Sequence, residues 1–265
     1  MNIFFLAREY INWLYHSTTR HGVHSPFVYR FIDECLYKKT DTTALKEILE
    51  QRKKLLKDCR ILEYNDPGAG GKTKTEKDIK IREVSVRILA RNSLQEKRFI
   101  LLFYRMIQFF NYQTILELGT SLGLTAACMG KANPAIHIDT IEGAKPVAAI
   151  AKNFFQNAGM NNILLHEGNF DAILTDVIQN TEYDLIYIDG NHREEKLLHY
   201  FHTLTEHISP KGVMIIDDIR WSASMLKAWQ NIKKHKKSRV TIDLFKLGLI
   251  FFDDRLNKEN FLIRF

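Results

Sequence analysis

The sequence predicts an α/β fold in which a doubly wound, mostly parallel sheet follows a helical extension. Short apolar runs alternate with segments of helical pattern through the second half of the chain, and each run leads into a glycine or a carboxylate. In such folds the carboxyl ends of the strands share one edge of the sheet, where ligands bind. We therefore expect a single ligand crevice at that edge. The runs are 114–118, 135–142, 162–166, 183–189 and 211–218.

The first run leads into a glycine turn. Residues 115–118 predict a buried strand that ends at Gly119, and a helix is expected to begin near Leu122. A turn of this kind before a helix presents backbone N–H groups to an anionic ligand. Gly119 and Gly123 would let the ligand approach, because neither carries a Cβ. The alternative is a strand–turn–helix that binds no ligand. The turn does not match the dinucleotide-binding fingerprint, because Ser121 stands where that motif has its second glycine.

The second run ends in an acid, Glu142, which lies 25 positions after Glu117. In α/β nucleotide sites an acid at about this spacing accepts hydrogen bonds from ribose hydroxyls. A carboxylate suits that task because it only accepts hydrogen bonds. The alternative, that Glu142 caps the helix expected at 144–157, stays open here.

Three more acids follow the later runs. Asp189 ends the fourth run, and Asp217 and Asp218 end the fifth. Carboxylates gathered at one edge repel one another unless a cation or strong donors compensate. Hard oxygen ligands suit Mg²⁺, Mn²⁺ or Ca²⁺, so the three acids predict a site for a divalent cation. Strand-end capping without a metal is the alternative.

The first turn resembles motif I of the class I S-adenosylmethionine-dependent methyltransferases, and the resemblance covers roughly residues 99–252. It implies a Rossmann-like sheet of seven strands closed by an antiparallel hairpin, which the runs 240–245 and 249–252 fit. It also implies that Glu117 faces the amino-acid end of the cofactor and that Asn169 and Phe170 contact the adenine. The full set of implied cofactor contacts is Glu117, Gly119, Thr120, Ser121, Gly123, Glu142, Gly143, Asn169, Phe170 and Asp189.

The strand-end acids narrow the resemblance to the catechol O-methyltransferase-like branch. The His-Gly-Val-His-Ser-Pro-Phe run at 21–27 resembles the opening of a bacterial subgroup of proteins with a methyltransferase core. That branch has an acid after the fourth strand and an Asp-Asn pair followed by Trp after the fifth, and these residues hold a metal that binds vicinal hydroxyls. Here Asp189 matches the first acid, but Asp218 replaces the Asn, which leaves the use of a metal open. His192 stands where the branch has a proton-accepting Lys, and imidazole, with a pKa near ~6.5, can serve as general base. We predict Asp189 and His192 as catalytic residues; the alternative for His192 is a helix-start histidine bonded to a carboxylate.

The chain is predicted to consist of a helical extension over residues 1–98 and a methyltransferase domain over 99–265. Helices are expected in the extension at 4–15, 27–37 and 43–56. A glycine- and lysine-rich loop near 65–80 is predicted to be mobile. Part of it approaches a phosphate-loop motif, but Asp66 stands where that motif requires glycine. His21 and His24 are expected to be structural rather than metal ligands.

Composition agrees with a cytoplasmic enzyme. Three cysteines without a CxxC spacing argue against a disulfide scaffold and a zinc site, and no apolar run approaches the ~18 residues of a membrane span. The formal net charge of +7 includes a basic run at 233–239, which we interpret as a solvated helix end.

We therefore predict an S-adenosylmethionine-dependent methyltransferase that methylates oxygen in a small hydroxylated molecule, with Mg²⁺ or another divalent cation as an optional second cofactor. The partner is expected to be a small molecule rather than nucleic acid, and a homodimer is allowed. Two alternatives stay open: a metal-free enzyme acting on RNA or on nitrogen, and a catalytically silent S-adenosylmethionine-binding protein.

Overall fold

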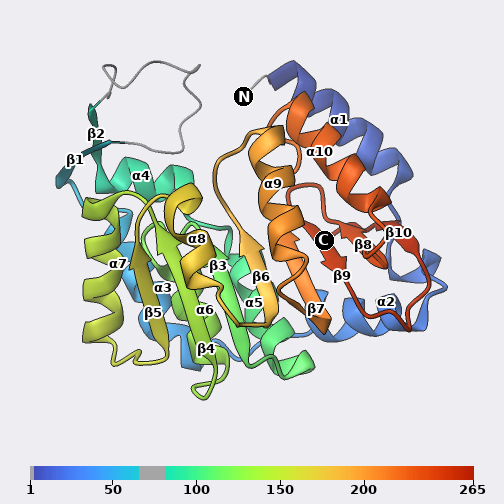
Figure 1. The fold of residues 1–265 in the computed structure, drawn as a ribbon, viewed down its shortest axis with the longest axis horizontal. Coiled ribbons are helices and arrows are strands. Elements are labelled where there is room, and N and C mark those ends of the chain that lie inside the picture. Colours follow the sequence, from blue (N-terminus) through green and yellow to red (C-terminus); the bar gives the residue numbers. More distant parts are fainter. Residues whose placement is uncertain (1–2, 66–80) are drawn as a thin grey trace. The chain divides into compact units, whose positions relative to one another are not determined.

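The computed structural model describes residues 3–65 and 81–265 (Figure 1). The predicted glycine- and lysine-rich loop, with its approach to a phosphate-loop motif, falls on residues outside these ranges. The chain divides into two compact units, which we describe separately. The first consists of Met1–Leu36 with Asn180–Phe265, and the second is Tyr37–Gln179.

The first unit joins the N-terminal helices to the C-terminal strands of the sheet. Its strand order is β10-β8-β9-β7-β6. Strand β6 runs parallel to β7, β9 is antiparallel to both β7 and β8, and β10 is parallel to β8. Its elements are α1 (Ile3–His16), a 3₁₀ turn (Arg20–Gly22), α2 (Pro26–Phe31), a π-helical turn (Ile32–Leu36), β6 (Tyr183–Ile188), α9 (Glu194–Leu204), β7 (Ile208–Ile216), α10 (Ala223–Lys234), β8 (Val240–Asp243), β9 (Gly248–Phe251) and β10 (Glu259–Leu262).

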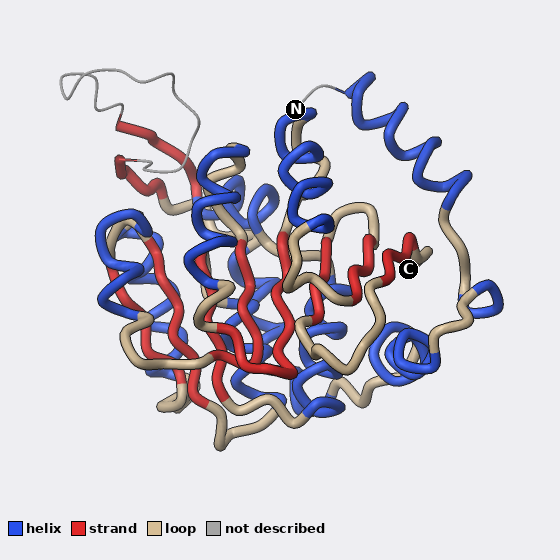
Figure 2. The backbone as a smooth tube through the Cα atoms, turned by 45° about the vertical axis from the view of Figure 1, so that its right-hand side comes forward, coloured by secondary structure: helices blue, strands red, loops and turns tan. Residues whose placement is uncertain are grey.

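The second unit contains three parallel strands in the order β3-β4-β5 and a separate antiparallel pair, β1-β2 (Figure 2). Strand β3 is buried at all of its residues except Thr114, as expected for a parallel strand that is covered on both faces. Its elements are a 3₁₀ turn (Thr43–Leu45), α3 (Lys46–Leu55), β1 (Ile61–Asn65), β2 (Ile81–Ser85), α4 (Val86–Ser93), α5 (Lys97–Phe110), β3 (Thr114–Leu118), α6 (Leu124–Ala132), β4 (His137–Glu142), α7 (Lys145–Asn157), β5 (Ile163–Glu167) and α8 (Phe170–Val177).

The predicted fold class is confirmed, because the strands alternate with helices and the larger sheet is mostly parallel. That sheet has eight strands rather than the seven implied by the resemblance. The additional strand is β10, which pairs with β8 at the sheet edge. The β1-β2 pair was not predicted from the sequence: residues 61–65 and 81–85 belong to the segment predicted as a helical extension, but they pair as antiparallel strands.

Helix α1 packs on the connection between β8 and β9. The Trp13 indole donates a hydrogen bond to the Asp243 carbonyl oxygen at 3.3 Å, and the Tyr10 ring meets the Phe245 ring edge-on at 5.0 Å between centroids. These contacts pack one face of the helix against the protein, as is usual for an amphipathic helix. None of the helices in the described part of the chain combines the length and apolar character needed to cross a membrane.

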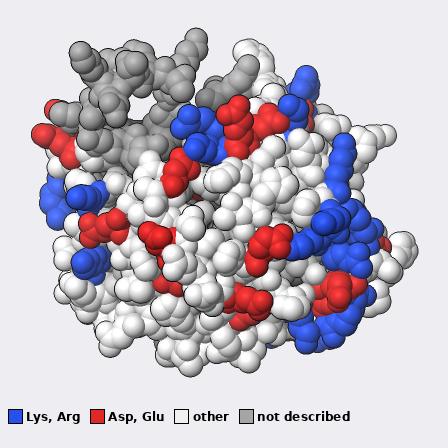
Figure 3. All heavy atoms as spheres, in the orientation of Figure 1, with Lys and Arg blue, Asp and Glu red and all other residues white. Residues whose placement is uncertain are grey.

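Basic side chains gather over the end of α10 and the C-terminal strands (Figure 3). The basic run 233–239 begins in the last turn of α10, where Lys233 and Lys234 complement the helix dipole. This location agrees with its interpretation as a helix end.

Candidate functional site

The glycine turn after β3 has the left-handed backbone that a ligand cradle requires. Gly119 has a φ of 104° and Ser121 a φ of 48°. Ser121 therefore adopts a left-handed conformation that is uncommon for residues other than glycine and carries a conformational cost. The N–H groups of Gly119 and Thr120 both donate to the Ile141 carbonyl oxygen, at 3.0 and 3.1 Å, so the turn is fixed to the end of β4.

The turn is closed by Glu142, at the end of β4. Glu142 Oε2 accepts a hydrogen bond from the Ser121 N–H at 2.8 Å, and Oε1 accepts one from the Ala144 N–H at 2.9 Å. Ala144 is the N-cap residue of α7, so Glu142 both faces the turn and supports the start of that helix. Each carboxylate oxygen has a second lone pair, and the ribose role predicted for Glu142 is compatible with both contacts.

A side chain at Gly123 would collide with α7. A Cβ on Gly123 would lie 2.9 Å from the Ala151 Cβ and 2.9 Å from atoms of the Phe155 ring, both on α7. Its φ of 80° also favours glycine. The missing Cβ therefore lets α7 pack closely here, and the cofactor contact predicted for Gly123 stays a prediction.

Glu117 lies beneath the turn in a buried polar network. Its side chain is fully buried, and Oε2 accepts a hydrogen bond from the Thr140 hydroxyl at 2.5 Å. The hydroxyls of Thr140 and Thr120 are 2.6 Å apart. Hydrogen bonding of this kind fixes the carboxylate from below.

Ser93, at the end of α4, contacts the turn and was not predicted. Its hydroxyl donates to the Leu89 carbonyl oxygen at 2.9 Å, and the Ser121 hydroxyl lies 2.8 Å from it, placed to donate. Ser93 and Ser121 are 28 residues apart, in segments that we assigned to different domains. No local pattern signals such a contact.

The predicted adenine-contacting residues lie at the start of α8. Asn169 is exposed and caps this helix, since its side chain accepts a hydrogen bond from the Asp171 N–H at 2.9 Å. Phe170 is half-buried, as is Gly143 after β4. The cofactor roles of these three residues stay predictions.

In the first unit, Asp189 and Asp217 follow the ends of β6 and β7 and are bridged by a tyrosine. The Tyr187 hydroxyl lies 3.1 Å from Asp189 Oδ2 and 3.1 Å from Asp217 Oδ2. Burial, followed by the negative charge of Asp218, raises the pKa of Asp189 to about 6. Burial and then the charge of Asp189 raise the pKa of Asp217 well above its usual range.

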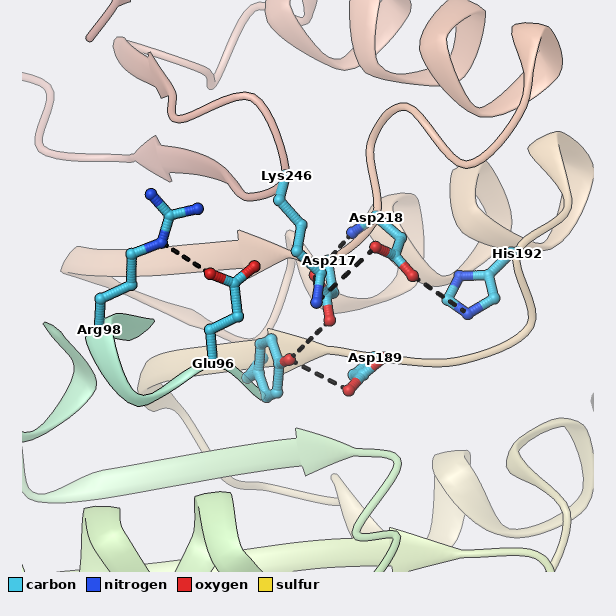
Figure 4. Close-up of polar contacts among 8 residues, drawn as sticks. Glu96, Arg98, Asp189, His192, Asp217, Asp218 and Lys246 are labelled. Atoms are coloured by element: carbon cyan, nitrogen blue, oxygen red, sulfur yellow. Dashed lines mark hydrogen bonds and ion pairs between the residues drawn. The ribbon is translucent and has the colours of Figure 1, made fainter. Parts of the chain in front are cut away.

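Asp218 lies between a histidine and a lysine (Figure 4). Its Oδ2 is 3.9 Å from His192 Nε2, and its Oδ1 is 4.0 Å from Lys246 Nζ, which is also 3.9 Å from Asp217 Oδ1. The His192 ring lies against the Trp221 ring, with centroids 5.1 Å apart. Asp218 has a φ of 51°, a conformation that Asp and Asn tolerate.

The carboxylates of the first unit do not fit a divalent cation in this arrangement. Among residues 3–65 and 81–265, no three His, Cys, Asp or Glu side chains are grouped so that they could hold a metal ion. Tyr187 bridges two of the three predicted ligands, and the Lys246 ammonium already lies near Asp217 and Asp218. The predicted ligands Asp189, Asp217 and Asp218 are therefore gathered, but without the geometry of a metal site.

Comparisons with known proteins agree with this fold. Residues 116–219 match the family model described as a methyltransferase domain. The chain is similar in structure to the methyltransferase PaMTH1 from Podospora anserina, with a TM-score of 0.60 and 15% identity over 88% of this chain and 97% of that one. It is also similar to the O-methyltransferase TomG from Streptomyces achromogenes (TM-score 0.52, 16% identity, 60% of this chain and 82% of that one) and to an O-methyltransferase from Bacillus cereus (TM-score 0.53, 15% identity, 85% and 97%).

At these identities the structural likeness concerns the fold, and the family match concerns the segment that contains the glycine turn, Glu142 and the strand-end acids. Residues 116–219 of this chain therefore match a methyltransferase domain, and the chain shares the fold of these solved methyltransferases.

Proposed function

We propose that this protein is an S-adenosylmethionine-dependent O-methyltransferase that acts on a small hydroxylated molecule. The observation that carries the proposal is the Gly119–Ser121 turn closed by Glu142, because it lies within the matched methyltransferase domain. Two of the similar proteins are named O-methyltransferases, and both were crystallised with S-adenosylmethionine or its demethylated product, abbreviated SAM and SAH. This likeness favours oxygen over nitrogen as the methylated atom.

The donor is assigned to the turn of the second unit. Gly119 and Ser121 would present backbone to it, and Glu142 would accept hydrogen bonds from the ribose hydroxyls. The left-handed backbone at 119 and 121 and the carboxylate directed at the turn fit this group. When bound, S-adenosylmethionine supplies an electrophilic methyl group, which a substrate oxygen takes while the C–S electron pair remains on sulfur.

The acceptor chemistry is assigned to the first unit, with His192 as general base. The His192 imidazole would take the proton of the substrate hydroxyl, and the resulting positive charge would be stabilised by Asp218, whose Oδ2 lies 3.9 Å from Nε2. The Trp221 ring limits the orientations of the imidazole. Asp189, which is half-buried at the end of β6, is proposed as a second acidic contact.

Isothermal titration with SAH tests donor binding. The wild type should bind, and Gly119→Arg should abolish binding, because a long side chain would fill the cradle. Gly159→Arg is the matched control, since Gly159 also has a positive φ but has open space around it and lies away from the turn, after α7. Absence of SAH binding in the wild type would refute the proposal.

A panel of catechols, phenols and aliphatic alcohols, assayed with radiolabelled SAM, tests the reaction. His192→Gln should lower kcat by roughly 10²–10⁴-fold, the usual contribution of a general base. His199→Gln, an exposed histidine on α9, is the control and should retain activity. Salt-sensitive methylation of RNA instead of the panel would favour the nucleic-acid alternative, and SAH binding without any transfer would favour a silent binding protein.

A further inference from the structure

The cluster of carboxylates in the first unit already contains a positive charge, supplied by the protein. Lys246 Nζ lies 3.9 Å from Asp217 Oδ1 and 4.0 Å from Asp218 Oδ1 (Figure 4). Its side chain is only 29% exposed, whereas that of Lys227, in an ordinary surface pair with Glu194, is 70% exposed. Lys246 also acts electrostatically on the Asp189 carboxylate. One ammonium group thus interacts with all three acids that we had predicted as metal ligands.

The backbone that carries Lys246 is held in place on both sides. The Lys246 carbonyl oxygen accepts a hydrogen bond from the Ile219 N–H at 3.1 Å, directly beside the acids at the end of β7. The preceding carbonyl, that of Phe245, accepts one from Arg220 Nη1 at 2.9 Å. The Phe245 N–H in turn donates to Asp243 Oδ1 at 2.9 Å. The connection between β8 and β9 is therefore built around the lysine position.

A second layer supports this connection. Arg220 forms a buried bidentate ion pair with Asp243, at 2.7 and 2.9 Å, and its guanidinium lies over the Phe245 ring, 5.1 Å from the centroid. Phe245 has a φ of 71°, which is unfavourable for a bulky residue and persists only where the surroundings enforce it. The ring is packed against Tyr10 and Trp13 of α1. The N-terminal helix thereby contributes to the placement of Lys246.

We propose that the Lys246 ammonium takes the place of a divalent cation at this cluster, neutralising the carboxylates and binding the acceptor oxygen as its proton leaves for His192. The inference rests on the proposed function for the identity of the acceptor. An ammonium group can donate hydrogen bonds to a developing oxyanion and stabilise its charge, as a metal would. Asp218, which stands where the resembled branch has an uncharged Asn, would then balance the positive charge of the lysine.

The first test needs no substrate. Mn²⁺ is titrated into the full-length protein at pH 7.5 and followed by electron paramagnetic resonance. The wild type should bind Mn²⁺ weakly, because Lys246 repels it, and Lys246→Met should bind at least tenfold more tightly. Lys246→Met with Asp217→Asn should lose that gain, which locates the ion. Lys227→Met is the control and should match the wild type.

Equal affinity of the wild type and Lys246→Met for Mn²⁺ would overturn the inference. So would tight binding in the wild type that Asp217→Asn removes, and this result does not depend on whether the lysine variant folds. SAH titration of both proteins verifies that the fold is intact. The same titration tests the proposed function separately. If the wild type does not bind SAH, the proposed function fails, but the Mn²⁺ affinities still show whether Lys246 occupies the cation position.

The second test uses the acceptor found in the panel assay. Wild-type activity should survive dialysis against EDTA, and Lys246→Met should lower kcat at least 100-fold and move the pH–rate profile to higher pH, since the acceptor hydroxyl would no longer be acidified. Lys246→Arg should restore part of the rate. Abolition of wild-type activity by EDTA, with recovery on adding Mg²⁺, would overturn the inference.

Discussion

The Ser121 N–H donates a hydrogen bond to Glu142 Oε2 at 2.8 Å, which joins the glycine turn after β3 to the end of β4. Both residues were predicted as cofactor contacts from their places in the sequence. Their direct bond means that Glu142 holds the turn in shape as well as facing it. Substitution of Glu142 should therefore affect the turn and the ligand together.

Glu142→Ala should weaken SAH binding by about 10–100-fold, because charge-assisted hydrogen bonds to a carboxylate contribute about 1.5–3 kcal/mol. Isothermal titration gives the affinity. The matched control is Glu167→Ala, since Glu167 is the register partner of Glu142 on β5 and is exposed. Equal effects of the two substitutions would contradict a ribose role for Glu142.

Gly123→Ala should destabilise the protein more than Gly159→Ala does. Both glycines have a positive φ, 80° and 63°, so both substitutions carry a similar backbone cost. Only Gly123 has neighbours, since its Cβ would lie 2.9 Å from Ala151 and Phe155, whereas nothing lies within 4 Å at Gly159. Overpacking should add about 1–3 kcal/mol to the loss of stability at Gly123, measured by urea denaturation. Equal losses would show that α7 moves away at no cost.

The raised pKa values of Asp189 and Asp217 predict that the free energy of unfolding falls as pH rises. Asp189 has its pKa raised to about 6 from its ordinary value of 3.8, so between these pH values the folded state holds a proton that the unfolded state has released. Unfolding then becomes easier with increasing pH, by at most about 3 kcal/mol for this group. Asp217, whose pKa is raised well above its usual range, acts in the same direction.

Denaturation midpoints at pH 4.5, 5.5, 6.5 and 7.5 should reveal this slope, and Asp189→Asn should reduce it. Asp176→Asn is the control, because Asp176 is exposed on α8 and distant in sequence from the cluster. A slope that Asp189→Asn leaves unchanged would show that the proton is held elsewhere.

Arg220→Met should destabilise the protein by about 3–5 kcal/mol, because it leaves the Asp243 carboxylate buried without its ion pair. The Trp229 indole, which donates to Asp243 Oδ2 at 3.0 Å, compensates only part of that charge. Arg255→Met removes a shorter but exposed pair with Asp253 and should leave the thermal midpoint unchanged. A small effect at Arg220 would mean that Asp243 becomes protonated or hydrated when its partner is removed.

Most of the fold could be predicted because its signals are local. Apolar runs of strand length, glycine at the first turn and acids at the strand ends each occupy a few consecutive residues, and all five predicted parallel strands are present. The β1-β2 pair was missed because charged residues within 81–85 weaken the strand pattern, and only pairing with 61–65 makes it a strand. The edge strand β10 follows the predicted hairpin, and its pairing with β8 could not be read from four residues.

The residues of the candidate site likewise fall into those that local sequence signals predicted and those that only the structure revealed. The sequence identified Gly119, Glu142 and the three strand-end acids, because residue type and position relative to a strand determine what such side chains offer to a ligand. It could not identify Ser93 or Lys246, because Ser93 contacts Ser121, and Lys246 contacts Asp217, from a segment distant along the chain.

Sequence alone thus determined which groups stand at the ends of the strands, since the alternation of strand and helix is encoded locally. Tertiary structure decided which groups neutralise the charges of these side chains. Whether the three carboxylates gather around a metal, a shared proton or the Lys246 ammonium depends on distances of about 4 Å between residues far apart in the chain, and folding sets those distances.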